Sequence, residues 1–309
     1  MMCTKRVAVL IPSYDRPEIL KVTLLSWLKA SCVNKVFVVA QASSKDKLEE
    51  YRRILERFKG DDKLIYMLVL GRLGSIKARN LLLDMALKYH QDYNYVVMVD
   101  DDCLPHYEKS LMIMMKSLEL DSKVGAVGGR VIAIKRRRGD PDFFLNLPTN
   151  LANLLTRLTG YIFLDIKHGP RYSEFLQLFL IMRKELLNMV RFDEAFNTPT
   201  SFREESDFQQ QIKQRGYKLL FVPQAYVLHL VPEEGGNRPR IDIKRRMYWK
   251  IRNHTVFIFK WNNSIIKRIW YLFLATLILL IYRPWHVFWI LKGLQDGIYA
   301  FKNTFEEVK

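Results

Sequence analysis

Cysteine is scarce in this 309-residue sequence, which contains only Cys3, Cys32 and Cys103. Their number is odd, and no two of them have the spacing of zinc ligands. We therefore exclude a small secreted fold held together by several disulfide bonds and a zinc site built on cysteine pairs. A reducing compartment is the more natural setting for such a chain.

The N-terminal segment lacks a hydrophobic stretch of the length found in signal peptides. After Lys5 and Arg6, only five apolar residues (7–11) precede Pro12. The apolar core of a signal peptide has about 7–15 residues. Nothing in this segment directs the chain outward, so we expect the protein on the cytoplasmic side of the cell membrane.

Acidic residues are in the minority, with 32 Asp and Glu against 49 Lys and Arg and a net charge of +17. The excess is concentrated in residues 236–309, which hold 14 basic and 4 acidic residues. Hydrophobic residues make up 49% of the chain, enough for a large core, which excludes an intrinsically disordered protein. The basic excess favours an anionic partner, such as a nucleic acid, a phosphorylated substrate or a membrane surface.

Strand and helix patterns alternate over the first hundred residues. Apolar runs predict buried strands at 7–11, 35–40, 64–70 and 95–99, and helical spacing predicts helices at 18–30, 48–58 and 76–89. This order predicts an α/β fold with a mostly parallel central sheet and helices on both faces. The loop at 12–17 and the acidic triplet at 100–102 then fall at the carboxyl edge of the sheet, where ligands bind in such folds.

The rest of the chain is less regular. Further strands are predicted at 124–134, 219–222 and 225–231, and a helix at 201–215 that Gly216 ends. The basic loop at 135–141 is explained as solvated surface, with a ligand-binding role as the alternative. From residue 238 the composition becomes basic and aromatic.

Residues 269–282 carry no charge, and as a helix they would span about 21 Å, shorter than the roughly 30 Å core of a bilayer. The flanking basic residues and aromatic side chains such as Trp270 and Trp285 favour a membrane-associated helical tail. Whether this tail spans the membrane or lies in its interface stays open. A buried core helix is the alternative.

Asp100, Asp101 and Asp102 are the strongest local signal for chemistry. Three adjacent carboxylates repel one another, and residues 95–104 contain no cation. Oxygen ligands of this kind suit Mg²⁺ or Mn²⁺ held together with substrate phosphates. The alternative is a polar turn that follows a strand.

A second acidic cluster consists of Glu204, Glu205 and Asp207. Ser201 and Glu204 have the spacing of a capping box at a helix start. A carboxylate held at this position could equally serve as a general base. His229, taken alone, is better explained as a satisfied or exposed histidine than as a ligand.

Taken in order, these segments resemble the family 2 glycosyltransferases of the GT-A fold. Residues 9–17 (Val-Leu-Ile-Pro-Ser-Tyr-Asp-Arg-Pro) are similar to the opening segment of that family. The other similar segments are 74–80, 99–105 with a DxD motif, 192–196 (Phe-Asp-Glu-Ala-Phe), 204–208 with an ED-type motif, and 216–229. The resemblance covers roughly residues 7–262.

This resemblance implies a nucleotide-sugar site and a metal site. The nucleotide-sugar-binding residues that it implies are Pro12, Ser13, Tyr14, Asp15, Arg16, Gln41, Arg79, Asn80, Asp100 and Asp101. It implies Mn²⁺ or Mg²⁺ on Asp102, with Asp100 and His229 as further ligands. Many relatives have an Asp where Gln41 stands, so the base of the nucleotide stays open.

Glu205 stands where the family usually has the Asp that deprotonates the acceptor, and Glu204 and Asp207 remain alternative bases. The implied reaction is an inverting, metal-dependent transfer of a sugar from a nucleoside-diphosphate sugar to the hydroxyl of a glycan or lipid-linked acceptor. A polyprenyl phosphate is the alternative acceptor. The implied domains are a nucleotide-sugar-binding half at 1–125, an acceptor-binding and catalytic half at 126–237, and the membrane-associated tail at 238–309.

Two other classes compete with this interpretation. A sugar-1-phosphate nucleotidyltransferase shares the sheet layout, but it typically has a glycine-rich loop after its first strand, and residues 12–17 contain no glycine. A basic nucleic-acid-binding protein would gain nothing from two acidic clusters at one sheet edge, because they would repel phosphates. We therefore expect no nucleic-acid partner.

Overall fold

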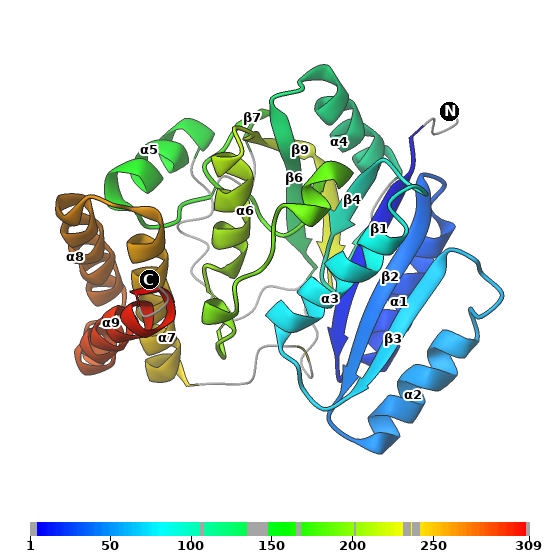
Figure 1. The fold of residues 1–309 in the computed structure, drawn as a ribbon, viewed down its shortest axis with the longest axis horizontal. Helices are drawn as coiled ribbons and strands as arrows, with labels where there is room; N and C mark the ends of the chain where they lie inside the picture. The colour runs from blue at the N-terminus through cyan, green and yellow to red at the C-terminus, as the bar shows by residue number, and fades with distance from the viewer. Residues whose placement is uncertain are drawn as a thin grey trace.

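The computed structural model describes residues 5–105, 108–134, 148–164, 168–200, 202–230, 236 and 242–306. Its N-terminal part alternates strand and helix as predicted (Figure 1). The elements are β1 (Val7–Tyr14), α1 (Pro17–Lys29), β2 (Val33–Ala42), α2 (Lys45–Glu56), β3 (Leu64–Leu70), α3 (Ser75–Lys88) and β4 (Tyr95–Met98). Both faces of this sheet are covered, which is why its central strands are continuous apolar runs.

One mixed sheet forms the centre of the protein, in the order β3-β2-β1-β4-β8-β6-β9-β5, with β7 (Arg171–Tyr172) beside β9. Strands β1 to β4 pair in parallel, and β8 (Leu180–Arg183) is antiparallel to both β4 and β6 (Val124–Ala133). Strand β9 (Lys218–His229) runs parallel to β6 and antiparallel to β5 (Cys103–Pro105). Cys103 lies opposite His229 in this last pairing, so the end of β9 comes next to the acidic triplet.

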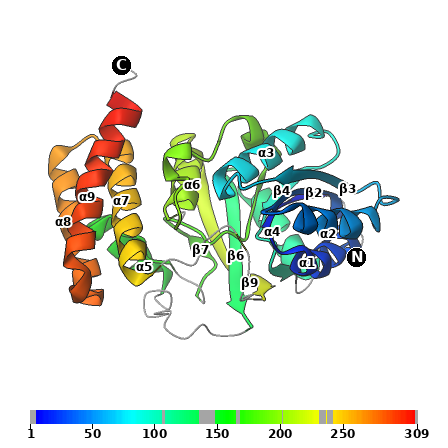
Figure 2. The ribbon, with the colours of Figure 1, turned by 90° about the horizontal axis from the view of Figure 1, so that it is seen from below.

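Helices cover both faces of the sheet (Figure 2). The first core contains α1, α2 and α4 (Glu108–Leu120), and the second contains α3 and α6 (Glu204–Gln214). Side chains of β1 alternate between the two cores, with Val7, Val9 and Ile11 in the first and Ala8 and Leu10 in the second. This alternation is the two-residue period of a strand. Short 3₁₀ helices η2 (Lys184–Asn188) and η3 (Glu194–Phe196) lead from β8 towards α6.

The C-terminal region is a layer of helices: α7 (Ile243–Trp261), α8 (Ile265–Tyr282), η4 (Pro284–His286), α9 (Val287–Phe301) and η5 (Lys302–Glu306). Together with α5 (Thr149–Thr159) they enclose a third core, whose buried members are Ala152, Tyr161, Phe163, Met247, Ile251, Ala275, Leu279 and Ile290. Gly293 lets α9 approach α7 closely, because a Cβ there would lie 2.4 Å from the backbone oxygen of Tyr248. The C-terminal helices therefore share a core with α5, which comes from the middle of the chain.

The structure differs from the predicted elements at β9 and α6. The strands predicted at 219–222 and 225–231 are one strand, because the pairing of β9 with β6 shifts register between Gly128 and Arg130 and extra β9 residues around Pro223 bulge out. Helix α6 begins at Glu204 rather than at 201. The basic loop at 135–141 lies outside the described residues.

The cysteines also differ from the simplest expectation. Cys32 is disulfide-bonded, and Cys103 is a buried free thiol. The sequence predicts no framework of several disulfide bonds, and a single bond is not such a framework.

Candidate active site

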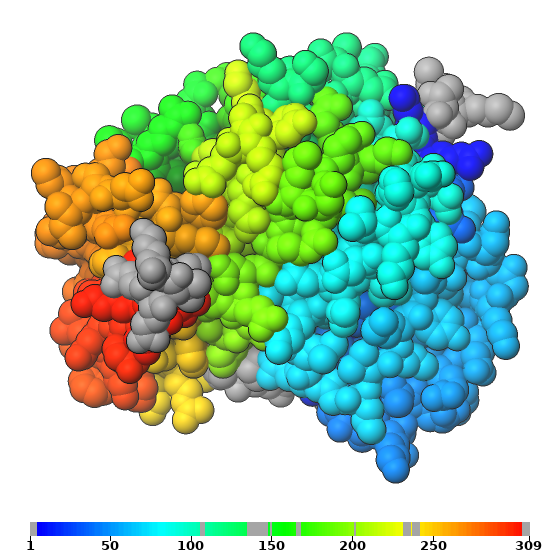
Figure 3. Space-filling view, viewed as in Figure 1, coloured from blue at the N-terminus to red at the C-terminus, as the bar shows by residue number. Residues whose placement is uncertain are grey.

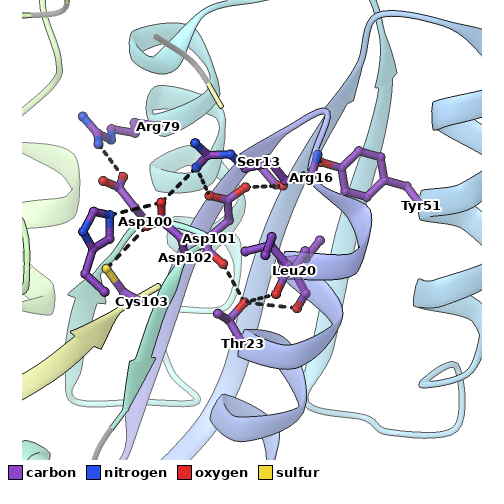
Figure 4. A network of polar contacts seen from close by, with 12 residues as sticks. Ser13, Arg16, Leu20, Thr23, Tyr51, Arg79, Asp100, Asp101, Asp102 and Cys103 are labelled. Carbon is purple, nitrogen blue, oxygen red and sulfur yellow. Dashed lines mark hydrogen bonds and ion pairs between the residues drawn. The ribbon is translucent and has the colours of Figure 1, made fainter. Parts of the chain in front are cut away.

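The acidic triplet follows β4 at the carboxyl edge of the sheet, beside the end of β1 (Figure 4). Asp101 is buried there and accepts a hydrogen bond of 2.6 Å from the hydroxyl of Ser13 to its Oδ2. Thr23 of α1 donates from Oγ1 to the backbone oxygen of Asp101 at 2.8 Å. The hydroxyl of Tyr51 lies 2.7 Å from that of Ser13 and accepts from the backbone N–H of Arg16. These contacts fix the triplet against β1, α1 and α2.

Arg16 supplies the cation that the triplet's own segment lacks. Its Nη1 lies 3.2 Å from Oδ1 of Asp101 and 2.9 Å from Oδ2 of Asp102. Burial raises the pKa of Asp101, and the neighbouring charge of Asp102 raises it further. Burial alone would raise the pKa of Asp102, but its hydrogen bond to His229 and the charges of His229 and Arg16 lower it. Asp102 is therefore the member of this pair that stays ionised most readily.

His229 approaches the triplet from the end of β9. Its Nε2 lies 3.1 Å from Oδ2 of Asp102, and the backbone oxygen of Asp102 accepts from the N–H of Leu230. The ring of His229 therefore has a partner in the acidic triplet. Asp100 is oriented differently, because its side chain is 44% exposed and pairs with Arg79.

Arg79 of α3 connects the two acidic clusters. One of its terminal nitrogens, Nη2, lies 2.8 Å from Asp100, and the other, Nη1, lies 2.6 Å from Glu204 and 3.9 Å from Glu205. Burial alone would lower the pKa of Arg79, but these three carboxylates outweigh it and raise the pKa. The arginine therefore remains charged in a buried position and holds the start of α6 against the end of β4.

The three candidate bases have different surroundings. Glu204 is buried and bound by Arg79, whereas the side chain of Glu205 is 27% exposed. Asp207 is fully buried and accepts hydrogen bonds from Trp261 and Gln211, with Lys260 at 2.8 Å. Burial raises the pKa of Asp207, and Lys260 opposes that shift. Asp207 thus connects α6 to the end of α7, and Glu205 is the most accessible of the three carboxylates.

Arg203 precedes these carboxylates and takes a left-handed backbone conformation with a φ of 72°. Its buried guanidinium donates to Nδ1 of His254 in α7 and to the backbone oxygen of Gly160, which ends α5. Burial lowers the pKa of Arg203 to about 9. Helix α6 has no side-chain cap, and Ser201 of the predicted capping box lies outside the described residues. Arg203 thus joins the start of α6 to α7 and to the end of α5.

The remaining predicted nucleotide-site residues lie near the same edge. Pro12, Ser13 and Tyr14 are in the last part of β1, and Asp15 follows them and accepts from the backbone N–H of Ser43 at 2.8 Å. Gln41 is the penultimate residue of β2, and its Oε1 accepts from the backbone N–H groups of Leu73 and Gly74, which orders the loop before α3. Asn80 bonds both the N–H and the C=O of Phe192. In these contacts Gln41 and Asn80 hold backbone of this protein.

A comparison with protein-family models identifies the family of this chain. The model of glycosyl transferase family 2 matches residues 8–165, which is half of the chain. The chain is a member of glycosyl transferase family 2. No curated protein matches it in a sequence comparison. This family 2 enzyme is therefore a glycosyltransferase, and the resemblance inferred from its motifs is confirmed.

Solved structures confirm the GT-A fold of this glycosyltransferase. Staphylococcus aureus TarS 1–349 in complex with UDP-GlcNAc matches with a TM-score of 0.63 and 16% identity, over 96% of this chain and 81% of that one. The Pyrobaculum calidifontis mannosyltransferase PcManGT in complex with GDP-Man and Mn²⁺ has a TM-score of 0.53 and 20% identity, with 98% and 88% covered. GalNAc-T7 with UDP, GalNAc and Mn²⁺ has a TM-score of 0.62 and 15% identity, over 98% of this chain and 57% of that one.

The residues of this glycosyltransferase fit a divalent ion only together with its substrate. Across the described residues, no three His, Cys, Asp or Glu side chains gather as a preformed metal cage. Asp102 and His229 do place one carboxylate oxygen and one imidazole nitrogen side by side. Mg²⁺ and Mn²⁺ are commonly held by one or two protein ligands and the phosphates of a substrate. This donor pair fits that mode of binding.

Several residues that contact the site lie outside the sequence motifs of this family 2 chain. Thr23, Tyr51 and His254 reach the site from distant segments, and Trp261 binds Asp207 from the end of α7. None of them belongs to a motif, and each contact joins segments far apart in the sequence. No local sequence signal could have identified them.

Proposed function

We propose that this glycosyltransferase moves a sugar from a nucleoside-diphosphate sugar to an acceptor hydroxyl with inversion, and that the transfer needs a divalent metal. The observation that carries the proposal is Arg79, which binds Asp100 after β4 and Glu204 at the start of α6. A donor-binding acidic cluster and a base-bearing cluster are thereby held on either side of one guanidinium. This arrangement suits a donor on one side and an acceptor on the other.

We infer that the nucleotide lies over the carboxyl ends of β1 and β2. Ligands of open α/β sheets bind beyond the carboxyl ends of the strands, and Pro12, Tyr14 and Asp15 lie there. Ser13, Gln41 and Asn80 order the surrounding backbone and side chains through the contacts described above. Arg16 pairs with Asp101 and Asp102, and so connects the end of β1 to the proposed metal ligand Asp102.

Asp102 and His229 would hold the metal, with Asp100, two residues before Asp102, as a further ligand. A divalent ion held by these residues would supply positive charge to the leaving diphosphate. Arg16 and Arg79 add positive charge on the protein side of the same region. Fixed charges of this kind stabilise a transition state because they need no rearrangement during the reaction.

We assign the role of general base to Glu205. It is the accessible carboxylate of its cluster, whereas Arg79 binds Glu204 and the end of α7 binds Asp207. The acceptor oxygen forms a bond to the anomeric carbon, the bond from that carbon to the diphosphate oxygen breaks with its electron pair, and Glu205 takes the hydroxyl proton. A single displacement of this kind inverts the anomeric centre.

The acceptor is a glycan or a lipid-linked molecule, and the protein works on the cytoplasmic surface of the cell membrane. Helix α8 supports the membrane part of this proposal, because its length and its mean hydropathy of 1.9 would suit a bilayer and only 17% of it is buried. A membrane-bound enzyme meets lipid-linked acceptors at the surface where they reside. A polyprenyl phosphate is the alternative acceptor favoured by the same helix.

The test compares wild-type protein with Glu205→Gln and with Asp207→Asn as the matched control. We expect Glu205→Gln to keep its thermal stabilisation by a nucleoside diphosphate with Mn²⁺, and to lose transfer by about 10²–10⁴-fold. Excess chelator should remove the stabilisation in both variants. Full transfer by Glu205→Gln, together with its loss in Asp207→Asn, would move the base to Asp207. Full transfer in excess chelator would overturn the metal requirement.

A further inference from the structure

Helix α5 carries leucines on its outer side. Ala152 and Thr156 face the interior, whereas Leu151, Leu154 and Leu158 are exposed. These three leucines recur at intervals of three and four residues, which places them on one face of the helix. An apolar face on the outside of a helix indicates a partner that is itself apolar.

The exposed face of α8 adjoins these leucines. The indole nitrogen of Trp270 donates to the backbone oxygen of Leu158 at 2.8 Å, and the hydroxyl of Tyr271 donates to that of Arg157 at 2.9 Å. Figure 3 shows the surface of α8 continuing into that of α5. The exposed apolar residues of α8 are Ile265, Ile266, Ile269, Trp270, Phe273, Leu277 and Ile281. Trp285, in the turn after α8, is 90% exposed.

The charge around this surface favours an anionic partner. Neither α5 nor α8 contains an acidic residue. Lys267 of α8 and Arg157 of α5 are exposed, and Arg157 is paired with Glu174. Lipid headgroups of anionic membranes attract such residues, while tryptophan and long basic side chains suit the interface between headgroups and acyl chains. Two copies of this chain would place the same positive charges against each other.

Helix α8 is attached to other helices along its length. Arg268 donates to the backbone oxygens of Phe259 and Asn262, Trp270 and Tyr271 are bound to α5, and Ala275 and Leu279 are buried in the third core. A membrane-spanning α8 would therefore carry the neighbouring helices with it. Arg157, whose backbone oxygen is bound by Tyr271 of α8, would then enter the hydrocarbon, which is costly for a charged group.

We propose that the outer faces of α5 and α8 together form one membrane-binding surface, on which the protein lies in the plane of an anionic lipid leaflet without crossing it. The surface thus includes the leucines of α5, far from the C-terminal tail in sequence. The proposal deepens the membrane placement given above. It does not depend on sugar transfer, because lipid binding needs neither donor nor acceptor.

The test measures cosedimentation of the full-length protein with phosphatidylcholine vesicles, with and without phosphatidylglycerol. The double variant Leu154→Glu/Leu158→Glu should lower the partition coefficient on anionic vesicles by about tenfold or more, because two apolar contacts are lost and negative charge is added. Leu154→Trp keeps the position apolar and should bind as the wild type does. The control is Leu25→Glu on α1, outside the proposed surface, where Leu25 is 41% exposed against 51% for Leu154 and 54% for Leu158.

Unchanged vesicle binding by a folded double variant would remove α5 from the surface. Extraction of membrane-bound protein by carbonate supports in-plane binding, and resistance to carbonate would show that α8 spans the bilayer. A lipid-free dimer of the wild type that the double variant abolishes would assign the surface to a second copy. Thermal unfolding of each variant checks that the fold is kept.

Discussion

Arg79 is a buried guanidinium that three carboxylates share, and its removal should be more harmful than the removal of its partner. The variant Arg79→Met leaves Glu204 buried without its cation, so we expect a loss of about 3–5 kcal/mol in the free energy of unfolding. The double variant Arg79→Met/Glu204→Gln should recover part of that loss, because no uncompensated charge remains. Urea denaturation of the three proteins measures both values. A loss below about 1 kcal/mol for Arg79→Met would mean that Glu204 is solvated or protonated instead.

The acidic residues of the site could be predicted from the sequence, but the residues that contact them could not. Asp102 and Glu205 stand out because several carboxylates cluster at a strand end and at a helix start, where charge must be compensated. The proximity of His229 to Asp102 depends on the pairing of β9 with β5, which no local pattern reveals. The same holds for Arg16, which is part of a recognised loop motif but whose bridge between Asp101 and Asp102 appears only in three dimensions.

Among the secondary-structure elements, α5 and α6 are connected by ion pairs to Glu174. It lies 2.6 Å from Arg157 of α5 and 2.6 Å from Lys213 of α6. Burial would raise the pKa of Glu174, but the hydrogen bonds and charges of Lys213 and Arg157 outweigh it and lower the pKa below its ordinary value of 4.5. A carboxyl with a lowered folded pKa stabilises the fold fully above its unfolded pKa, and this contribution is lost as the pH falls through the folded value.

We therefore expect Glu174→Gln to lower the free energy of unfolding by about 1 kcal/mol at neutral pH, since both pairs are partly exposed. The difference from wild type should shrink as the pH falls below 4.5 and vanish in strong acid. Urea denaturation at a series of acidic pH values measures it. A difference that stays constant with pH would show that packing, rather than charge, connects the two helices.

The strands that sequence predicts well are those buried on both faces, such as β1 and β2, because their apolar runs are continuous. Strand β8 is harder to predict, because its four residues acquire their place only by pairing between β4 and β6. The sequence predicts two strands in place of β9, separated at Pro223, because a bulge that accommodates proline depends on the partner strand. Local pattern thus gives the N-terminal sheet, and long-range pairing gives the rest.

In the molecule as a whole, the C-terminal helices pack against the rest of the glycosyltransferase fold and share buried contacts with it. Their core includes Ala152 of α5 and Tyr161 and Phe163 from the segment after it. Asp207 of α6 binds Trp261 and Lys260 at the end of α7. The boundary predicted at residue 238 therefore separates segments that share buried contacts, and a chain cut there would expose apolar surface.

Arg203 has a further consequence for how the enzyme works. Gly160 ends α5 with a φ of 66°, and its carbonyl accepts a hydrogen bond from Arg203. Glu204 directly follows Arg203 in the sequence. A lipid leaflet that contacts α5 would thus lie one hydrogen bond away from the residue that precedes α6 and its carboxylates, so this enzyme should show interfacial activation. We expect the rate of transfer to a water-soluble acceptor analogue to rise severalfold when anionic vesicles are added. In Leu154→Glu/Leu158→Glu the basal rate should persist and the rise should disappear, as kinetics across a lipid titration would show. No rise in the wild type would mean that the membrane does not change the turnover of the enzyme, and an equal rise in both proteins would mean that α5 does not carry the effect.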